Sequence, residues 1–130
     1  MIGIDTNIFI RYIVRDDDKQ ASEADKLLKS CSNDCKALIN QIVLVEIIWV
    51  LKRLYKYPKI DLLKILELLL CNEEIEVLNK EEAKTAMLQF ETGNADFSDY
   101  YLSEINKSNG VSLTFTFDKK AAKSKNFCLP

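Results

Sequence analysis

The stretch Met1-Ile2-Gly3-Ile4-Asp5-Thr6-Asn7 decides the fold. Its apolar run ends in an acid, which predicts a buried strand whose carboxyl end delivers a carboxylate into a strand-to-helix turn. Apolar residues then recur at the spacing of one helix face, at Ile8, Phe9, Tyr12 and Ile13. A strand that runs directly into a helix is the first unit of an α/β protein.

The same alternation continues along the chain. Apolar periodicity and boundary residues predict further helices over residues 21–30, 61–70, 79–91 and 96–107, and one that starts at Gln41 and is stopped by Pro58. Short apolar runs predict strands over residues 37–39, 75–78 and 111–117. The crossovers are long enough for parallel pairing. We therefore expect an α/β fold, a three-layer α/β/α sandwich with a small central parallel sheet, in a single domain over residues 1–130.

The composition narrows the class of protein. The 130 residues are 48% hydrophobic and 29% charged with only 3 Gly and 2 Pro, which is typical of a compact, helix-rich globular protein and excludes disordered and collagen-like chains. The net charge is −2, so no overall positive field attracts nucleic acid. A nucleic-acid partner would have to be met by a local basic patch.

Two residue types restrict the chemistry. The chain has no His, which excludes Ser-His-Asp and Cys-His catalysis and His-containing zinc sites. The four Cys do not form a Cys-X-X-Cys pair, since three residues separate Cys31 from Cys35, and we expect reduced structural thiols. The N-terminus lacks a secretory signal and charges interrupt the apolar stretches, so we expect a soluble cytoplasmic protein without a membrane segment.

Two acids follow predicted strands. Asp5 comes directly after the first strand, and Asp118 comes directly after the strand over residues 111–117. In open α/β sheets, ligands bind outside the carboxyl ends of the strands. A single acid at such a position is also a common helix N-cap, so each of these acids alone supports both interpretations.

Three further acids lie on predicted helices. Glu46 stands among Ile, Val, Leu and Trp residues, where an ionised carboxylate is costly unless it is paired or metal-bound. The alternative is a Glu that reaches the rim of the core or meets a Lys from elsewhere. Asp96 and Asp99 share one face at a helix N-terminus, where capping by Asp96 is the structural alternative. Carboxylates that converge from strand ends and helices would bind a hard divalent cation such as Mg²⁺ or Mn²⁺.

Taken together, the motifs resemble the PIN domain, and closely its VapC-type toxin ribonucleases. The resemblance spans nearly the whole chain. It rests on four motifs in series, namely Asp5-Thr6-Asn7, Glu46 within Val-Glu-Ile-Ile-Trp-Val-Leu, Ala95-Asp96-Phe97-Ser98-Asp99, and Thr114-Phe115-Thr116-Phe117-Asp118. The helix after Asp99 departs from the family, because Tyr100-Tyr101-Leu102-Ser103-Glu104 replaces a run of small residues.

The resemblance implies a ribonuclease that depends on Mg²⁺ or Mn²⁺. It assigns Asp5, Glu46, Asp99 and Asp118 as an acidic, metal-binding quartet and Asp96 as an additional catalytic acid. Which of Asp96 and Asp99 is the closer ligand, and whether one metal or two act, is left open. Thr6, Asn7 and Thr116 occupy the polar positions whose hydrogen bonds orient the acids. Without His, the nucleophile is expected to be water activated by the metal.

Local cations would hold the RNA. Lys119, Lys120, Lys123 and Lys125 follow Asp118 directly, and Arg11 is a further candidate together with Arg15, Lys52 and Arg53. The alternative for the lysine run is a solvated surface.

The family resemblance also implies partners, namely a cognate antitoxin protein and a second copy of the chain in a homodimer. The apolar helix over residues 61–70 offers more hydrophobic surface than a small core absorbs, which favours the dimer unless this helix is central to the core. Two rival functions remain. One is a catalytically silent PIN-like protein-binding module. The other is a haloacid-dehalogenase-like phosphatase, which needs a second acid where this chain has Asn7.

Overall fold

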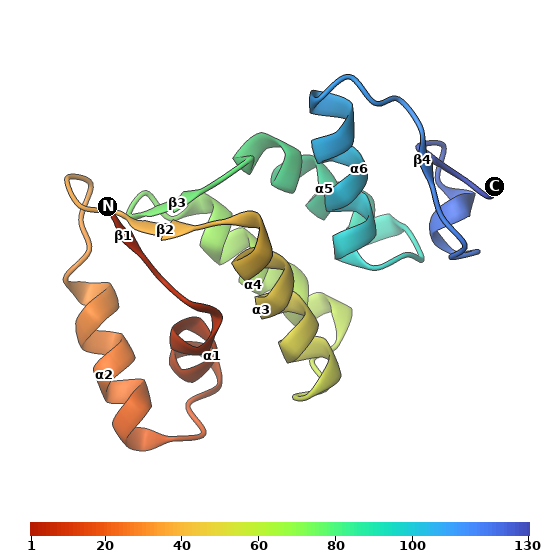
Figure 1. Ribbon diagram of the computed structural model, residues 1–130. Coiled ribbons are helices and arrows are strands. Elements are labelled where there is room, and N and C mark those ends of the chain that lie inside the picture. Colours follow the sequence, from red (N-terminus) through yellow and green to blue (C-terminus); the bar gives the residue numbers. More distant parts are fainter. The chain divides into compact units, whose positions relative to one another are not determined.

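The computed structural model describes residues 1–130 and divides into two compact units, Met1–Leu78 (unit 1) and Asn79–Pro130 (unit 2). The chain forms six α-helices and a parallel three-stranded sheet, which confirms the predicted α/β class (Figure 1). The prediction of a single domain over residues 1–130 stays a prediction. None of the helices has the length and hydropathy needed to cross a membrane.

The sheet lies in unit 1 and consists of β1 (Ile2–Gly3), β2 (Ala37–Ile39) and β3 (Ile75–Val77) in that order. All neighbours are parallel, and Ile2, Ala37 and Ile75 stand opposite one another. In β2 and β3 the outer residues are buried and the middle residue is half-buried, so one face of the sheet carries the core. The predicted strands at 37–39 and 75–78 are therefore confirmed to within one residue.

Helices form both crossovers of unit 1. The first crossover contains α1 (Thr6–Val14) and α2 (Asp18–Lys29), and the second contains α3 (Gln41–Arg53) and α4 (Lys59–Cys71). Right-handed crossovers that advance in one direction across a sheet place their helices on the same face. Figure 1 shows α1 to α4 on one side of the three strands. Each crossover leaves the sheet at the carboxyl end of a strand. The starts of α1 and α3, which follow β1 and β2, therefore lie at the carboxyl edge of the sheet.

The helix α3 begins with a side-chain cap, because the Asn40 side chain accepts the backbone N–H of Val43 at 2.9 Å. Only Glu46 is charged between Gln41 and Leu51, which favours a deeply buried helix, and this expectation was wrong. Its buried face consists of Val43, Leu44, Ile47, Ile48 and Leu51. Its opposite face is open, since Ile42 is 69% exposed and Trp49 is 54% exposed. A helix that covers one face of a sheet buries only one side, whatever the polarity of the other.

The helix α4 contributes mainly to the core. Leu62, Leu66, Leu69 and Leu70 are fully buried at the spacing of one helix face, whereas Leu68 is exposed. The interpretation of this helix as central to the core is therefore the better one. The four cysteines of the chain are free, and burial raises the pKa of the Cys31 thiol.

Unit 2 is built on a pair of packed helices, α5 (Lys80–Thr92) and α6 (Phe97–Ser108). The Phe97 ring meets Phe90 edge-on at 6.2 Å and stacks on Tyr101 at 5.4 Å between ring centroids. Burial raises the pKa of Tyr101 to about 12. These aromatic contacts hold α5 and α6 together in the core of unit 2.

The predicted strand over residues 111–117 was too long. The structure has only β4 (Thr114–Phe115), which pairs in parallel with β5 (Phe127–Cys128) in a separate two-stranded sheet. The partner strand is two residues long, so the ladder ends with the bond from Thr116 N to Cys128 O at 2.9 Å. Between the two strands lies the short 3₁₀ helix η1 (Ala121–Lys123).

Candidate active site

Asp5 occupies the N-cap position of α1, immediately after the sheet. Its backbone is extended, with φ −79° and ψ 158°, and its side chain makes no capping hydrogen bond. The strand before it is fixed by the bond from Ile4 N to Leu38 O at 3.2 Å. The carboxylate of Asp5 is exposed and is not used as a cap, unlike the usual acid at this position.

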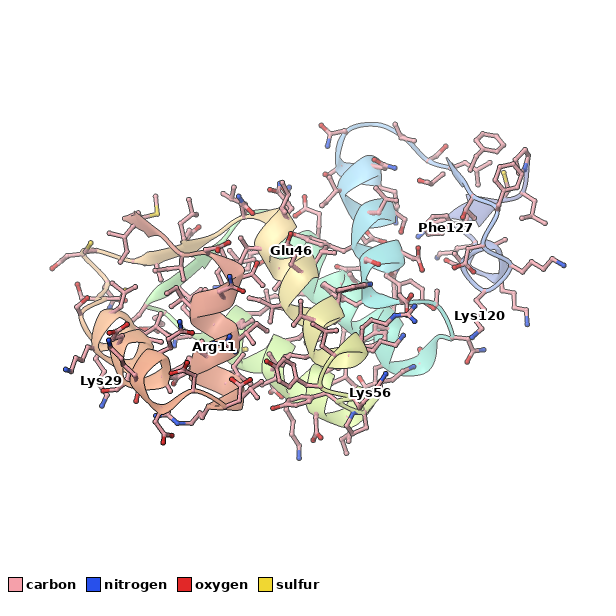
Figure 2. All side chains as sticks on the ribbon, turned by 60° about the horizontal axis from the view of Figure 1, so that its bottom comes forward. Arg11, Lys29, Glu46, Lys56, Lys120 and Phe127 are labelled. Carbon is pink, nitrogen blue, oxygen red and sulfur yellow. The ribbon has the colours of Figure 1, made fainter.

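Glu46 lies on the exposed face of α3, three residues before Trp49, so the interpretation of a Glu that reaches the rim of the core is the better one (Figure 2). Solvent reduces the cost of its charge. The hydroxyl of Thr6 donates to Glu46 Oε2 at 2.6 Å, and Thr6 itself is only 4% exposed. A buried donor thus holds one oxygen of an exposed carboxylate.

The Thr6 contact brings two predicted acids to one place. Thr6 is the first residue of α1, and Asp5 precedes it directly, so Glu46 lies beside the turn that carries Asp5. The packing of α1 against α3 fixes this arrangement. Asn7, the third polar residue of the motif, is exposed.

In unit 2, Asp96 and Asp99 lie at the N-terminus of α6. Asp96 is the N-cap and forms a capping box with Asp99, in which the backbone N–H of Asp96 donates to Asp99 Oδ2 at 3.2 Å. The helix dipole favours both negative charges at this end. The two acids are therefore neighbours, and a structural role in capping accounts for part of the pattern.

Asp118 lies three residues beyond the end of β4 and is exposed. Its Oδ1 accepts the backbone N–H groups of Lys120 at 2.8 Å and Ala121 at 3.2 Å, which caps η1. Its own backbone N–H donates to Thr116 Oγ1 at 3.0 Å. One oxygen of Asp118 thus shapes the turn that starts the lysine run.

The predicted RNA-binding cations differ in their surroundings. Arg11 forms an ion pair with Asp16 at 2.9 Å and donates to Gln20 Oε1 at 2.6 Å. The hydroxyl of Tyr55 and Arg11 hold the pKa of Asp16 below its usual value. Arg11 is therefore engaged in the linkage of α1 to its neighbours. By contrast, Lys119, Lys120, Lys123 and Lys125 are exposed, and the ion pairs of the structure involve none of them (Figure 2 labels Lys120).

The five candidate acids fit a divalent metal by their chemistry, since every donor is a carboxylate oxygen, the ligand that Mg²⁺ and Mn²⁺ prefer. Asp5 and Glu46 belong to unit 1, and the other three acids belong to unit 2. Within either unit, no three acidic or cysteine side chains form a group that could hold a metal ion. Convergence of all five acids stays a prediction.

These observations define an α/β protein with oxygen-donor acids at the carboxyl edge of a small parallel sheet. The family model of the PIN domain matches residues 2–126, and the chain belongs to this family. No curated protein matches the chain. PIN domains are typically metal-dependent nucleases that act on nucleic acids, so the class supports hydrolase activity on nucleic acid.

The sequence did not point to one polar cluster in unit 2. Glu104 is 8% exposed, and its Oε1 accepts from Gln89 Nε2 at 2.9 Å, Lys107 Nζ at 3.4 Å and Asn126 Nδ2 at 3.4 Å. The only sign of this cluster in the sequence was Glu104 itself, an acid in the stretch after Asp99 that departs from the family. Its partners come from three separate segments, so no local motif joins them.

Proposed function

We propose that this chain is a Mg²⁺- or Mn²⁺-dependent endoribonuclease of the VapC toxin type. Asp5, Glu46, Asp99 and Asp118 are the proposed metal ligands, and Asp96 is the additional acid. The observation that carries the proposal is the exposed carboxylate of Glu46, held by buried Thr6 beside an Asp5 that does not cap its helix. If Asp5 and Glu46 served only the fold, we would expect Asp5 to cap α1 and Glu46 to form an ion pair.

The chemistry follows from the residues available. A bound divalent cation supplies acidity to a water molecule and stabilises negative charge on the phosphate. The carboxylates hold the cation, and Thr6 keeps Glu46 in one orientation because its hydroxyl donates to Oε2. A carboxylate of the set accepts the proton of the water, since the chain offers no His for this role.

The proposal includes the setting of the enzyme. We propose RNA as the substrate, a cognate antitoxin as the inhibitory partner, a homodimer as the assembly and the cytoplasm as the compartment. The main competitor is a catalytically silent PIN-like binding module. The two functions differ in one measurable property, namely whether the purified chain cleaves RNA when a divalent metal is added.

The first test removes one proposed ligand. Asp5→Asn keeps the size of the side chain and deletes its charge, so we expect RNA cleavage in Mn²⁺ to fall by roughly three orders of magnitude or more. The control is Asp34→Asn, which makes the same charge change at an exposed loop residue and should cleave like the wild type. An Asp5→Asn variant with full activity would contradict the assignment.

The second test measures the metal without RNA. A cation that binds only the folded state stabilises it by about 2.7 kcal/mol at a concentration 100 times its Kd. We expect Mn²⁺ to raise the Tm of the wild type and to raise that of Glu46→Gln much less. Equal shifts in the two proteins would remove Glu46 from the ligand set.

A further inference from the structure

Unit 2 contains a pocket that the proposed catalytic acids do not line. It lies between the turn that joins α5 to α6 and the segment around η1, and its volume is about 350 Å³. The principal lining residues are Gln89, Asn94, Lys120, Lys123, Lys125 and Asn126. All of them belong to unit 2, so the pocket is complete within that unit.

All charged side chains that line this pocket are positive. Three lysines line it and no acid does. The lysines are exposed and form no ion pair, whereas Lys84 and Lys107 in the same unit are paired with Glu81 and Glu104. Unpaired like charges around one cavity repel one another, and an anion in the cavity relieves that repulsion. The pocket therefore favours an anionic occupant.

The walls of the pocket are fixed by buried contacts. Gln89 and Asn126 both donate to Glu104, which joins α5, α6 and the C-terminal segment. Tyr100 closes one side, because its hydroxyl accepts the backbone N–H of Ala95 at 3.3 Å. The amide side chains of Gln89 and Asn126 are therefore held by the core of unit 2, so that they lose little freedom when a ligand binds.

The lining also offers hydrogen bonds for a group next to the anion. Amide and hydroxyl side chains stand beside the lysines at Asn94, Ser124 and Asn126. Gln89 Oε1 is buried and has no donor. A ligand that carries N–H or O–H groups supplies the kind of donor that this acceptor lacks. A bare anion such as phosphate supplies none once it is fully ionised.

We propose that this pocket binds one nucleotide of the RNA substrate, with the phosphate at Lys120, Lys123 and Lys125 and the nucleoside against the amide side chains. The volume lies at the lower end of the range for ligand sites, roughly 300–1,000 Å³, which suits one nucleotide and not a folded partner. The inference rests on the proposed function, since it takes RNA as the substrate. It assigns a nucleotide pocket to side chains other than the proposed metal ligands.

The first experiment tests the charge. Binding of a fluorescent 12-nucleotide single-stranded RNA to the full chain is measured by anisotropy in EDTA, so that no cleavage occurs. The double variant Lys123→Gln/Lys125→Gln should bind roughly tenfold more weakly, and its slope of log K against log[salt] should fall by about 0.7, because the pocket holds one phosphate. The control Lys26→Gln/Lys29→Gln removes the same charge from exposed positions of α2 and should bind like the wild type.

The second experiment tests whether the RNA occupies the volume of the pocket. Asn94→Leu removes an amide and fills part of the pocket without changing the charge, so it should weaken binding severalfold and leave the salt slope unchanged. Ser22→Leu, on the exposed face of α2, is the matched control. If the lysine variants weaken binding but Asn94→Leu does not, the lysines act as a diffuse surface charge and the pocket proposal is overturned. Melting curves of all variants confirm that each one is folded.

The outcomes separate this inference from the proposed function. RNA that binds through the pocket without being cleaved in Mn²⁺ would refute the ribonuclease and leave the pocket standing. RNA that is cleaved in Mn²⁺ and binds equally to the wild type and the lysine variants would refute the pocket and leave the ribonuclease standing. A wild-type chain that shows no RNA binding in EDTA at low salt also overturns the pocket.

Discussion

At the scale of single residues, Thr6 controls the geometry of Glu46. Its hydroxyl is the donor at 2.6 Å, and its burial prevents water from replacing it easily. Thr6→Val keeps the shape and removes the donor. We expect RNA cleavage to fall by roughly 10–100-fold, the usual effect of losing a group that orients a ligand.

The matched variant for this prediction is Thr6→Ser, which keeps the hydroxyl and loses a methyl group. It should retain most of the activity. Urea unfolding of both variants separates an effect on the site from an effect on stability. If Thr6→Val cleaves RNA as fast as the wild type, the hydrogen bond has no part in catalysis.

At the scale of elements, the turn between α5 and α6 depends on Gly93. A methyl group at this position would collide with the ring of Tyr100, 2.6 Å from Cζ, and with the carbonyl oxygen of Gln89 at 2.9 Å. The backbone of Gly93 has φ −94°, so the obstacle is space and not backbone strain. Gly93→Ala should therefore destabilise the protein by about 1–3 kcal/mol, as overpacking of a tight site does.

A double-mutant cycle identifies the colliding group. Tyr100→Leu removes the distal part of the ring, so Gly93→Ala should cost less in that background than in the wild type. The free energy of unfolding in urea is the measurement. Additive losses would show that the carbonyl of Gln89, and not Tyr100, forbids the side chain.

The linkage of α1 to α2 is sensitive to acid. Arg15 binds Asp25 through two hydrogen bonds of 2.9 and 2.8 Å, and this contact lowers the pKa of Asp25. The hydroxyl of Tyr55, together with Arg11, does the same for Asp16. Lowered carboxyl pKa values in the folded state stabilise it above the unfolded pKa, roughly pH 4, and this stabilisation disappears as the pH falls through the folded pKa.

The corresponding measurement compares unfolding in urea at pH 7 and pH 3. The wild type should lose more stability between these values than Asp16→Asn/Asp25→Asn, because the double variant has already lost both contacts. Asp34→Asn, at an exposed loop position, should behave like the wild type. An equal loss in all three proteins would assign the acid sensitivity to other carboxylates.

At the scale of the whole molecule, the proposed homodimer needs a surface other than the core leucines of α4, which unit 1 buries itself. The exposed apolar residues that remain in unit 1 include Ile42, Trp49, Leu54, Ile60 and Leu68. We expect light scattering at micromolar concentration to give the mass of a dimer. A monomer mass over the whole concentration range would refute the dimer and leave the ribonuclease proposal untouched.

The sequence predicted the class of fold, because the periodicity of apolar residues and the residues at the ends of helices and strands are local features of the sequence. The parallel strands at Ala37–Ile39 and Ile75–Val77 and all six helices lie close to their predicted places. Prediction from the sequence failed where the length of a strand or the exposure of a side chain depends on residues far away in the chain. The strand around Thr114 is short because β5 is short, and Glu46 is exposed because α3 covers the sheet with its other face.

The sequence also indicated candidate acids for a site, and their convergence stays a prediction. Residue type and order indicated the acids, since carboxylates after strands and at helix starts are visible in the sequence. The ion pair of Arg11 with Asp16 could not be foreseen, because it depends on how a turn closes. The capping contact of Asp118 was one of the two interpretations that its position supported. The polar pocket of unit 2 could not be predicted from the sequence, because its walls come from segments that are far apart in the chain.

The open face of α3 has a spectroscopic consequence. Trp49 is the only tryptophan of the chain, and it lies three residues after Glu46, on the same side of the helix. Paramagnetic Mn²⁺ held at Glu46 should quench the indole emission, whereas diamagnetic Mg²⁺ at the same place should leave its intensity nearly unchanged. The difference between the two titrations would report metal entry without RNA or label, and its loss in Glu46→Gln would locate the ion.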